Sequence, residues 1–408
     1  MTDEPDNVDY DVVIIGGGMV GASLACALAS QPQLRIAVVE AFPHDADSQP
    51  SFDDRVIAMN YGSRRIWEAM GLWQELEPVV EAITNIHVSD RGRLGATRLN
   101  YREERVEALG YVAENRLIGQ ILMKRLQDLE HIHWYCPATI DSLRQNNDRV
   151  ELDISQQASS TQISCRLLVA ADGANSTARK LAGLSMRRED YQQAAIITNV
   201  ETEYPHQGTA YERFTDSGPL AFLPMTQLRS SVVWTVNLSD RDRVMALADD
   251  EFIAELQNRF GYRLGHILKA GLRHAYPLAY VEAEQLVKGR VVVIGNAAHA
   301  LHPVSGQGYN LALRDVAEIA ELIASAEDPG HELLLAEYAR KRREDMQRVY
   351  RLTDGLVKIF SNTISPLAHA RAAGLIVVDL WPSLRHLLAR QSMGLMGRMG
   401  KMLRRLPL

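Results

Sequence analysis

The chain has 408 residues, of which 46% are hydrophobic and 23% charged, and its formal net charge is -7. This composition is typical of a globular protein long enough for two domains, and the acidic balance argues against a general affinity for nucleic acid. Cys26, Cys136 and Cys165 are far apart and form no C-x-x-C pair, so we expect a reducing cytoplasm, no disulfide framework and no metal site. Residues 1–11 lack the apolar core of a secretory signal, and no apolar run reaches the roughly 18–20 residues of a membrane span.

Residues 10–40 predict a dinucleotide-binding unit: a β-branched apolar strand, a G-x-G-x-x-G turn, a helix and a second strand that ends on Glu40. Gly16 would allow the tight turn, Gly18 the close approach of a pyrophosphate, and Gly21 the close packing of helix on strand. Phosphates would lie at the helix N-terminus, where free N–H groups favour negative charge. Glu40 would accept a hydroxyl of an unphosphorylated ribose, which favours FAD or NAD over NADP. The alternative is a glycine-rich turn without a ligand.

Two polar residues follow this unit with open roles. Arg55 either reaches back to a cofactor phosphate or forms a surface ion pair with Asp53 or Asp54. Asn115 precedes an amphipathic helix predicted over residues 118–129, and it either caps that helix or contacts a ligand. Short strands are predicted at residues 83–88, 96–101, 133–135, 139–143 and 150–154.

A second buried strand of the parallel type is predicted at residues 167–171, and it ends in Asp172 and Gly173, with Arg179 shortly after. Open α/β sheets bind ligands at the carboxyl ends of their strands, so Asp172 is a candidate for ligand contact. An ordinary Asp-Gly turn is the alternative. From residue 194 to 238 the pattern becomes β-rich, which predicts a mainly antiparallel sheet inserted into the first domain, followed by a helix at 249–260.

A third stretch combines a buried strand at residues 291–294 with the turn Gly295-Asn296 and a proline- and glycine-rich loop at 302–308. A helix with an apolar face is predicted from Tyr309 onward. The loop therefore delivers a second helix N-terminus that could stabilise an anion.

Together the three stretches resemble the group A FAD-dependent aromatic hydroxylases, the para-hydroxybenzoate hydroxylase fold, over about residues 10–343. The family's third motif usually reads Gly-Asp, whereas this chain has Gly295-Asn296, which keeps hydrogen bonding but lacks the charge. The run of residues 295–298 and the loop that follows resemble the ubiquinone-pathway branch, most of all the 2-polyprenyl-6-methoxyphenol hydroxylase type. The resemblance implies cofactor contacts at Gly16, Gly18, Gly21, Glu40, Arg55, Asn115, Asp172, Gly173, Arg179, Gly295, Asn296, Pro303, Gly306, Gly308 and Asn310.

The fold that the resemblance implies is α/β. A Rossmann-like FAD-binding domain would span residues 9–182 and 281–345, and a mainly antiparallel substrate domain would be inserted at 183–280. A C-terminal helical region would occupy residues 346–408.

The implied activity is hydroxylation of the aromatic ring of a polyprenylated phenol in ubiquinone biosynthesis. NAD(P)H would dock transiently and reduce FAD, and molecular oxygen would then form a flavin hydroperoxide that attacks the ring. His302 is a candidate proton acceptor for the phenol, or else a structural histidine before Pro303. Two other classes stay open: a reductase or halogenase of the same fold, although Trp234-Thr235-Val236 does not match the halogenase motif W-x-W-x-I-P, and a non-catalytic flavin-binding partner in a biosynthetic assembly.

The C-terminal end reverses the charge of the chain, because no acidic residue follows Asp379. A basic amphipathic helix here would suit an anionic membrane surface, and we expect a cytoplasmic protein peripheral to the inner membrane. Alternatively, the apolar residues pack on the protein's own helices or on a partner protein, and Gly394, Gly397 and Gly400 favour this because they weaken a helix. The cations are Arg385, Arg390, Arg398, Lys401, Arg404 and Arg405.

Overall fold

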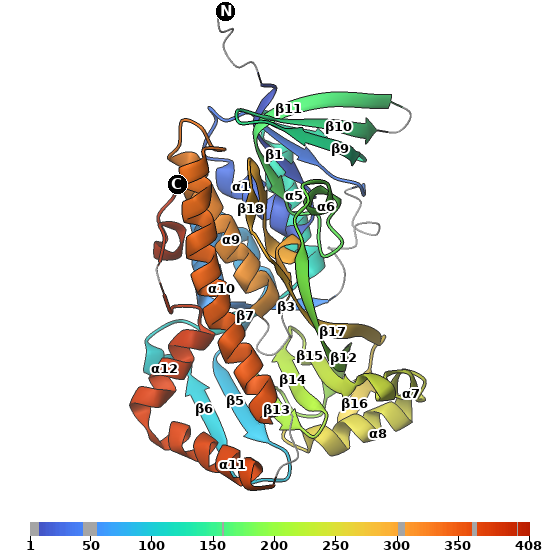
Figure 1. Ribbon diagram of the computed structural model, residues 1–408. Coiled ribbons are helices and arrows are strands. Elements are labelled where there is room, and N and C mark those ends of the chain that lie inside the picture. The colour runs from blue at the N-terminus through green and yellow to red at the C-terminus, as the bar shows by residue number, and fades with distance from the viewer. Residues whose placement is uncertain (1–7, 44–54, 157–158, 301–306, 361–364, 398) are drawn as a thin grey trace, which may run out of the picture.

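The computed structural model describes residues 8–43, 55–156, 159–300, 307–360, 365–397 and 399–408 (Figure 1). Its first sheet runs in the spatial order β18 (Val287–Lys288), β19 (Val291–Val293), β11 (Ser159–Ala170), β1 (Tyr10–Ile15), β2 (Ile36–Val39) and β8 (Ile132–Tyr135). The pairs from β19 to β8 are parallel. An antiparallel hairpin of β9 (Thr139–Gln145) and β10 (Val150–Gln156) extends β11.

Helices make the centre of this sheet fully buried, which explains its β-branched apolar strands. α1 (Met19–Leu28) packs against α5 (Asn115–Gln127) and α9 (Gln307–Ala324). Because β19, β11 and β1 are parallel neighbours, their carboxyl ends lie at one edge of the sheet. The three motifs follow these three strands, so the topology brings them together.

A small antiparallel sheet of β3 (Val56–Asn60), β7 (Gly110–Glu114) and β4 (Glu81–Ile83) lies between the first sheet and the rest of the chain (Figure 1). Short helices accompany it: α2 (Tyr61–Ala69), α3 (Trp73–Leu76), a 3-10 turn at Glu77–Val79 and α4 (Tyr101–Glu104). A core of apolar side chains runs from the parallel sheet through these elements.

The second large sheet runs in the order β20 (His299–Ala300), β17 (His274–Ala283), β12 (Met186–Thr202), β15 (Arg229–Asn237), β14 (Gly218–Pro224), β13 (Thr209–Thr215), β5 (Asn85–Asp90) and β6 (Ala96–Asn100), with β16 (Ile267–Ala270) beside β12. α8 (Asp249–Phe260) covers one face with its own apolar core, preceded by α7 (Arg241–Met245). The predicted boundaries leave β5 and β6 in the first domain, but β5 pairs with β13. A pairing across more than a hundred residues leaves no local signal in the sequence.

The described parts of the C-terminal region up to residue 392 form α10 (Glu332–Phe360), α11 (Ser365–Leu380) and α12 (Pro382–Ser392). The expectation of one basic amphipathic helix is wrong beyond Ser392, because Gly394 and Gly397 take positive φ values of 70° and 96° and end the helix. The chain then packs back on the protein, with Met393 and Met402 buried and a short 3-10 turn at Met402–Arg404. Arg405 bonds Glu68 and the Tyr61 hydroxyl of α2.

Within the described ranges, no single helix has both the length and the apolar character to cross a membrane. Arg371–Leu380 and Pro382–Ser392 pass such a test only as a pair, and they are bent by 99° relative to each other.

Candidate functional site

The first glycine turn is built so that no side chain intrudes on the N-terminus of α1. Gly16 has φ +99°, and a Cβ there would lie 2.7 Å from the carbonyl oxygen of Ala171, at the end of the neighbouring strand. A Cβ on Gly21 would lie 1.8 Å from the carbonyl oxygen of Gly16. Gly18 is the N-cap of α1 and has no side chain, so it makes no side-chain cap to the first N–H groups of the helix. This cradle fits the pyrophosphate of a dinucleotide.

Glu40 is buried at the end of β2 and is fixed by backbone donors. Its Oε2 accepts a hydrogen bond from the Gly17 N–H at 2.5 Å, and its Oε1 accepts one from the Phe42 N–H at 2.8 Å. Each carboxylate oxygen keeps a second lone pair, so Glu40 can still accept a ribose hydroxyl. The contact with the cofactor itself remains a prediction.

The second motif serves the structure of its own turn. The Asp172 carboxylate accepts from the N–H groups of Thr177 and Ala178 at 2.7 and 3.1 Å and from the Ser176 hydroxyl, so it caps α6 (Thr177–Leu181). Gly173 has φ +82° and stands in open space. The Asp-Gly turn therefore has a structural role, and any contact with FAD would add to it.

Arg179 joins the second motif to the third. Its guanidinium is buried and donates to the carbonyl of Ala297 at 2.9 Å and to that of Ala174 at 3.1 Å. Burial lowers the pKa of Arg179, and Asp172 opposes this shift. The side chain thus holds the turn at Gly295–Ala297 through the Ala297 carbonyl. Its effect on a cofactor would be to position this turn.

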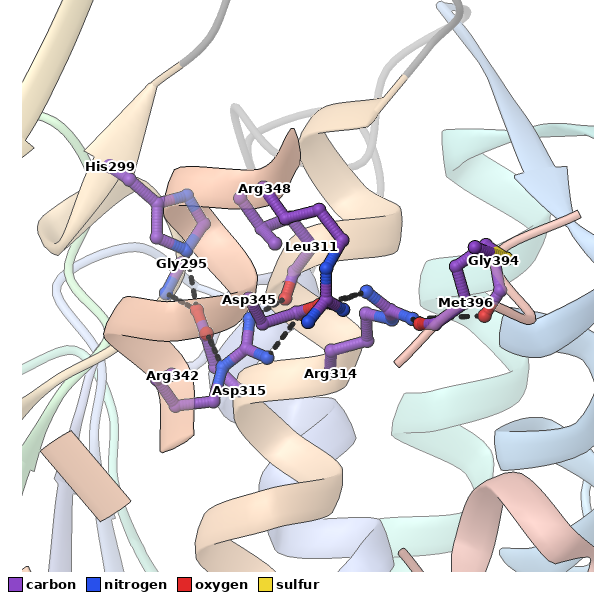
Figure 2. Close-up of polar contacts among 10 residues, drawn as sticks. All are labelled: Gly295, His299, Leu311, Arg314, Asp315, Arg342, Asp345, Arg348, Gly394 and Met396. Atoms are coloured by element: carbon purple, nitrogen blue, oxygen red, sulfur yellow. Dashed lines mark hydrogen bonds and ion pairs between the residues drawn. The ribbon is translucent and has the colours of Figure 1, made fainter. Parts of the chain in front are cut away.

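The third motif rests on a carboxylate that the sequence reasoning missed. Gly295 has φ +57°, and its N–H donates to Asp315 Oδ2 at 2.9 Å (Figure 2). The same oxygen lies 2.6 Å from His299 Nε2, while Arg342 Nε donates to Asp315 Oδ1 at 2.7 Å. Burial alone would raise the pKa of Asp315, but His299 and Arg342 hold it below its usual range. A charged residue within the apolar helix predicted after Tyr309 was the available signal.

The network continues from α10 to the C-terminal tail, as Figure 2 shows. Asp345 bonds Arg342 Nη1 and Arg314 Nη1, both at 2.6 Å. Arg314 Nη2 then donates to the carbonyls of Gly394 and Met396. Buried charged side chains that are each paired with side chains of opposite charge form a rigid network. The tail is therefore attached to the same polar chain that fixes Gly295.

Asn296 is the exposed member of this turn, so its side chain is accessible to a ligand. Asn310 is buried and oriented toward the protein: its Oδ1 accepts from Asn60 N and Ser63 Oγ, and its Nδ2 donates to the carbonyl of Ala58. Its side chain ties α9 to β3 and α2, so its predicted cofactor contact has no support from these bonds.

Arg55 and Asn115 lie side by side near the second sheet. The Asn115 N–H donates to the Arg55 carbonyl at 2.9 Å, and the Arg55 guanidinium lies 5.2 Å from the ring centre of Tyr276 on β17. Asn115 is the first residue of α5, and Glu114 takes the N-cap position, so the capping role expected for Asn115 is wrong by one residue. An Arg55 ion pair with Asp53 or Asp54 lies outside the described residues.

Three further predicted residues, His302, Pro303 and Gly306, lie outside the described residues. Gly308 is in the first turn of α9, where a Cβ would meet nothing within 4 Å. In the described part of the chain, no group of three or more His, Cys, Asp or Glu side chains could hold a metal ion.

Residues 9–353 match the family model described as FAD binding domain. The ubiquinone hydroxylase UbiL of Rhodospirillum rubrum is 39% identical over 389 residues, which cover 94% of this chain and 89% of that protein. The 3-demethoxyubiquinol 3-hydroxylase of Escherichia coli is 29% identical and covers 97% of this chain and 100% of its own. Among solved structures, p-nitrophenol 4-monooxygenase PnpA of Pseudomonas putida superposes with a TM-score of 0.80 at 18% identity, over 96% of this chain and 99% of that one.

Proposed function

We propose that this chain, which belongs to the family of FAD-dependent aromatic hydroxylases that includes the ubiquinone hydroxylases, adds one oxygen atom to the ring of a polyprenylated phenol on the route to ubiquinone. The observation that carries the proposal is the meeting of three glycine turns at one edge of the parallel sheet, beside a second sheet. The names of two relatives that this chain matches over nearly its whole length, a ubiquinone hydroxylase and a demethoxyubiquinol hydroxylase, support the substrate class.

The residues of this chain have distinct tasks in that reaction. The turn at Gly16–Gly21 would bind the pyrophosphate of FAD against the N-terminus of α1, and Glu40 would hold the ribose. Asp315 and Arg179 would position the turn at Gly295, where Asn296 is accessible to the cofactor. When bound, FAD supplies the redox chemistry and the activation of oxygen. The protein supplies position, dryness and electrostatics for it.

A nicotinamide donor, NADH or NADPH, is proposed as the reductant. The sequence has one G-x-G-x-x-G unit between two strands, and FAD takes that unit, so the donor would dock transiently.

The test is to incubate the purified yellow protein with NAD(P)H, a prenylated phenol and isotopically labelled O₂. We expect a product heavier by one labelled oxygen atom. Gly18→Val is the matched control, because its side chain would enter the pyrophosphate path and abolish flavin retention. Reduction or halogenation of the substrate without labelled oxygen would contradict the proposal, as would a flavin-loaded protein with no turnover.

We also propose that the protein works at a membrane surface, and that it docks through the bend between α11 and α12 and not through residues 393–408. The bend between α11 and α12 exposes large apolar side chains, among them Leu380 at 75% and Trp381 at 61%. Val377, Leu384 and Leu387 extend this exposed corner. Tryptophan favours the bilayer interface, and a polyprenyl tail resides in the bilayer.

The sequence around this corner is poor in acidic residues, which is compatible with an anionic membrane surface. Residues 371–408 contain a single acidic residue, Asp379, in a chain whose net charge is -7. The lysines and arginines of this segment are Arg371, Arg385, Arg390, Arg398, Lys401, Arg404 and Arg405. Several of them pair with acidic side chains elsewhere, such as Arg385 with Glu103, so the apolar corner would contribute most of the binding.

Sedimentation with anionic liposomes tests this proposal. We expect Leu380→Glu combined with Trp381→Glu to abolish binding while the FAD content stays unchanged. Leu272→Glu, at an 85% exposed leucine in the loop between β16 and β17, is the matched control and should bind as the wild type does. Equal sedimentation of the double variant would contradict the role of this corner. Loss of association with other pathway proteins, and not with lipid, would indicate a protein partner there.

A further inference from the structure

The second sheet presents two different faces, and strand register assigns each residue to one of them. Tyr211 on β13 is paired with Phe222 on β14, and both rings contact Phe260 of α8. These residues therefore lie on the helix-covered face. Since side chains alternate along a strand, Glu212 and Ala221, the next pair, lie on the opposite face.

The opposite face is a wall with an aliphatic row across its middle, flanked by the polar side chains of Ser231 and Thr235 on β15. Ala221 is paired with Val233 on β15, Val233 with Ile197 on β12, and Glu212 with Val88 on β5. Between β5 and β12, Glu212 therefore stands in a row that is otherwise aliphatic, and the row ends on Thr97 of β6 and His274 of β17. A wall of this kind would suit the ring of a prenylated phenol.

This wall faces the domain that carries the glycine turns. At one end, Ala210 and Met225 pack against Ile83 and Val112 of the small sheet β3–β7–β4. At another, Tyr276 lies under the Arg55 guanidinium and shares the face, because it is paired with Ala195, two residues before Ile197. The Glu212 face is thus the side of the second sheet that is turned toward the candidate flavin site.

Glu212 is a titratable group on this wall that lacks a partner in the described part of the chain, whereas the other unpartnered groups there, the hydroxyls of Ser231 and Thr235, do not titrate in this range. Its Oε1 atom is buried and has no hydrogen-bond partner within the described ranges, and no cation there is paired with the carboxyl. Burial raises the pKa of this carboxyl from 4.5 to about 7. By contrast, Asp90 on the same face at the end of β5 is paired with a cation, because its Oδ2 lies 3.2 Å from Arg371 Nη2. A buried carboxyl without a partner costs stability, so such a group is a candidate for function.

We propose that Glu212 is the proton acceptor for the phenol, an inference that rests on the proposed function. The O–H bond of the substrate breaks, its proton moves to the Glu212 carboxylate, and the electron pair stays on the ring oxygen. The ring thereby becomes more nucleophilic toward the activated oxygen. After oxygen transfer, the oxygenated ring carbon loses its hydrogen as a proton to water, and Glu212 returns its proton to the ring oxygen. This assignment takes the role that the sequence alone gave to His302.

The test uses the holoenzyme and a nitrophenol as a chromogenic probe, because its phenolate absorbs at longer wavelength than its neutral form. We expect the wild type to bind the probe as the phenolate near neutral pH. Glu212→Gln, which keeps the side-chain volume, should shift the bound probe toward the neutral phenol by tenfold or more. With the prenylated phenol it should lower kcat by about 10²–10⁴-fold, with KM and FAD content little changed.

Two controls separate catalysis from structure. The first control is Glu255→Gln. Glu255 lies on α8 and pairs with Arg243, so this variant should ionise the probe and turn over substrate as the wild type does. The second control is Glu212→Asp, which keeps the carboxyl and should restore part of the ionisation of the bound nitrophenol. If Glu212→Gln does not fold, the comparison of Glu212→Asp with the wild type is the test. A His302→Gln variant that loses ionisation while Glu212→Gln keeps it would overturn the assignment.

The failures of the two proposals are distinguishable. If the wild type holds the probe neutral, or if Glu212→Gln ionises it equally, the role of Glu212 is overturned even where labelled oxygen enters the product. If the wild type ionises the probe through Glu212 but transfers no labelled oxygen to any prenylated phenol, the proposed substrate fails while the site assignment stands.

Discussion

Asp315 behind the third glycine turn and Glu212 on the second sheet both have carboxylate oxygens shielded from water, but their surroundings are opposite. Asp315 is bonded to His299, Arg342 and the Gly295 N–H, and its pKa is held low. Glu212 has no such partners in the described structure, and its pKa is raised to about 7. A group surrounded by partners is fixed in one protonation state and serves as a support. A group without them can exchange a proton, so the difference separates a structural role from a chemical one.

The largest effect is expected from breaking the support. Asp315→Asn would leave the buried Arg342 guanidinium with only Asp345 as a carboxylate partner and weaken the bond to Gly295, so we expect a loss of about 3–5 kcal/mol of stability and poor FAD retention. Urea unfolding and the flavin content of the purified protein measure both effects. Glu344→Gln removes an exposed pair with Arg340 and should cost under about 0.5 kcal/mol. Equal losses in the two variants would show that the network does not support the turn.

The second prediction uses the sign of the Glu212 shift. Below pH 4.5 the carboxyl is neutral in both the folded and the unfolded chain. Between pH 4.5 and about 7 the folded chain keeps a proton that the unfolded chain releases, so the free energy of unfolding falls as the pH rises. The loss should reach about 3–4 kcal/mol, at about 1.4 kcal/mol for each pH unit between 4.5 and about 7. Glu212→Gln should lack this component, and parallel stability curves for the two proteins between pH 4 and about 8 would contradict the raised pKa.

The sequence predicts the local features of this molecule better than the contacts between distant segments. The family and the α/β fold expected from the three motifs are confirmed, because each motif is a local strand–turn–helix pattern. The partners of Asp315 come from two separate segments, residues 295–299 and α10, and the face of Glu212 depends on the register of strands distant in sequence. The placement of β5 and β6 in the second sheet has the same cause. Periodicity identifies an element and its buried side, but not which distant element covers it.

The third prediction concerns the first glycine turn. In Gly21→Ala the new Cβ would lie 1.8 Å from the Gly16 carbonyl oxygen, so the turn and α1 must separate. We expect a cost of about 1–3 kcal/mol and at least a tenfold loss in FAD affinity. Gly374→Ala on α11, where a Cβ meets nothing within 4 Å, is the matched control and should retain FAD fully. Fluorescence titration of the apoprotein with FAD measures both, and undiminished affinity in Gly21→Ala would contradict the cradle.

The smallest effect is expected at Asn296, the exposed member of the supported turn. Because Asp315 and Arg179 hold the turn by its backbone, a change of the Asn296 side chain should leave the fold intact and report only on the ligand. Asn296→Asp should keep FAD, because a carboxylate also accepts a hydrogen bond from a ribityl hydroxyl. Asn296→Leu removes that bond and should weaken the binding of FAD by about 1 kcal/mol, which is roughly a fivefold increase in Kd. The same titration of the apoprotein measures both variants, and equal affinities would place the Asn296 side chain outside the cofactor site while leaving the role of Asp315 untouched.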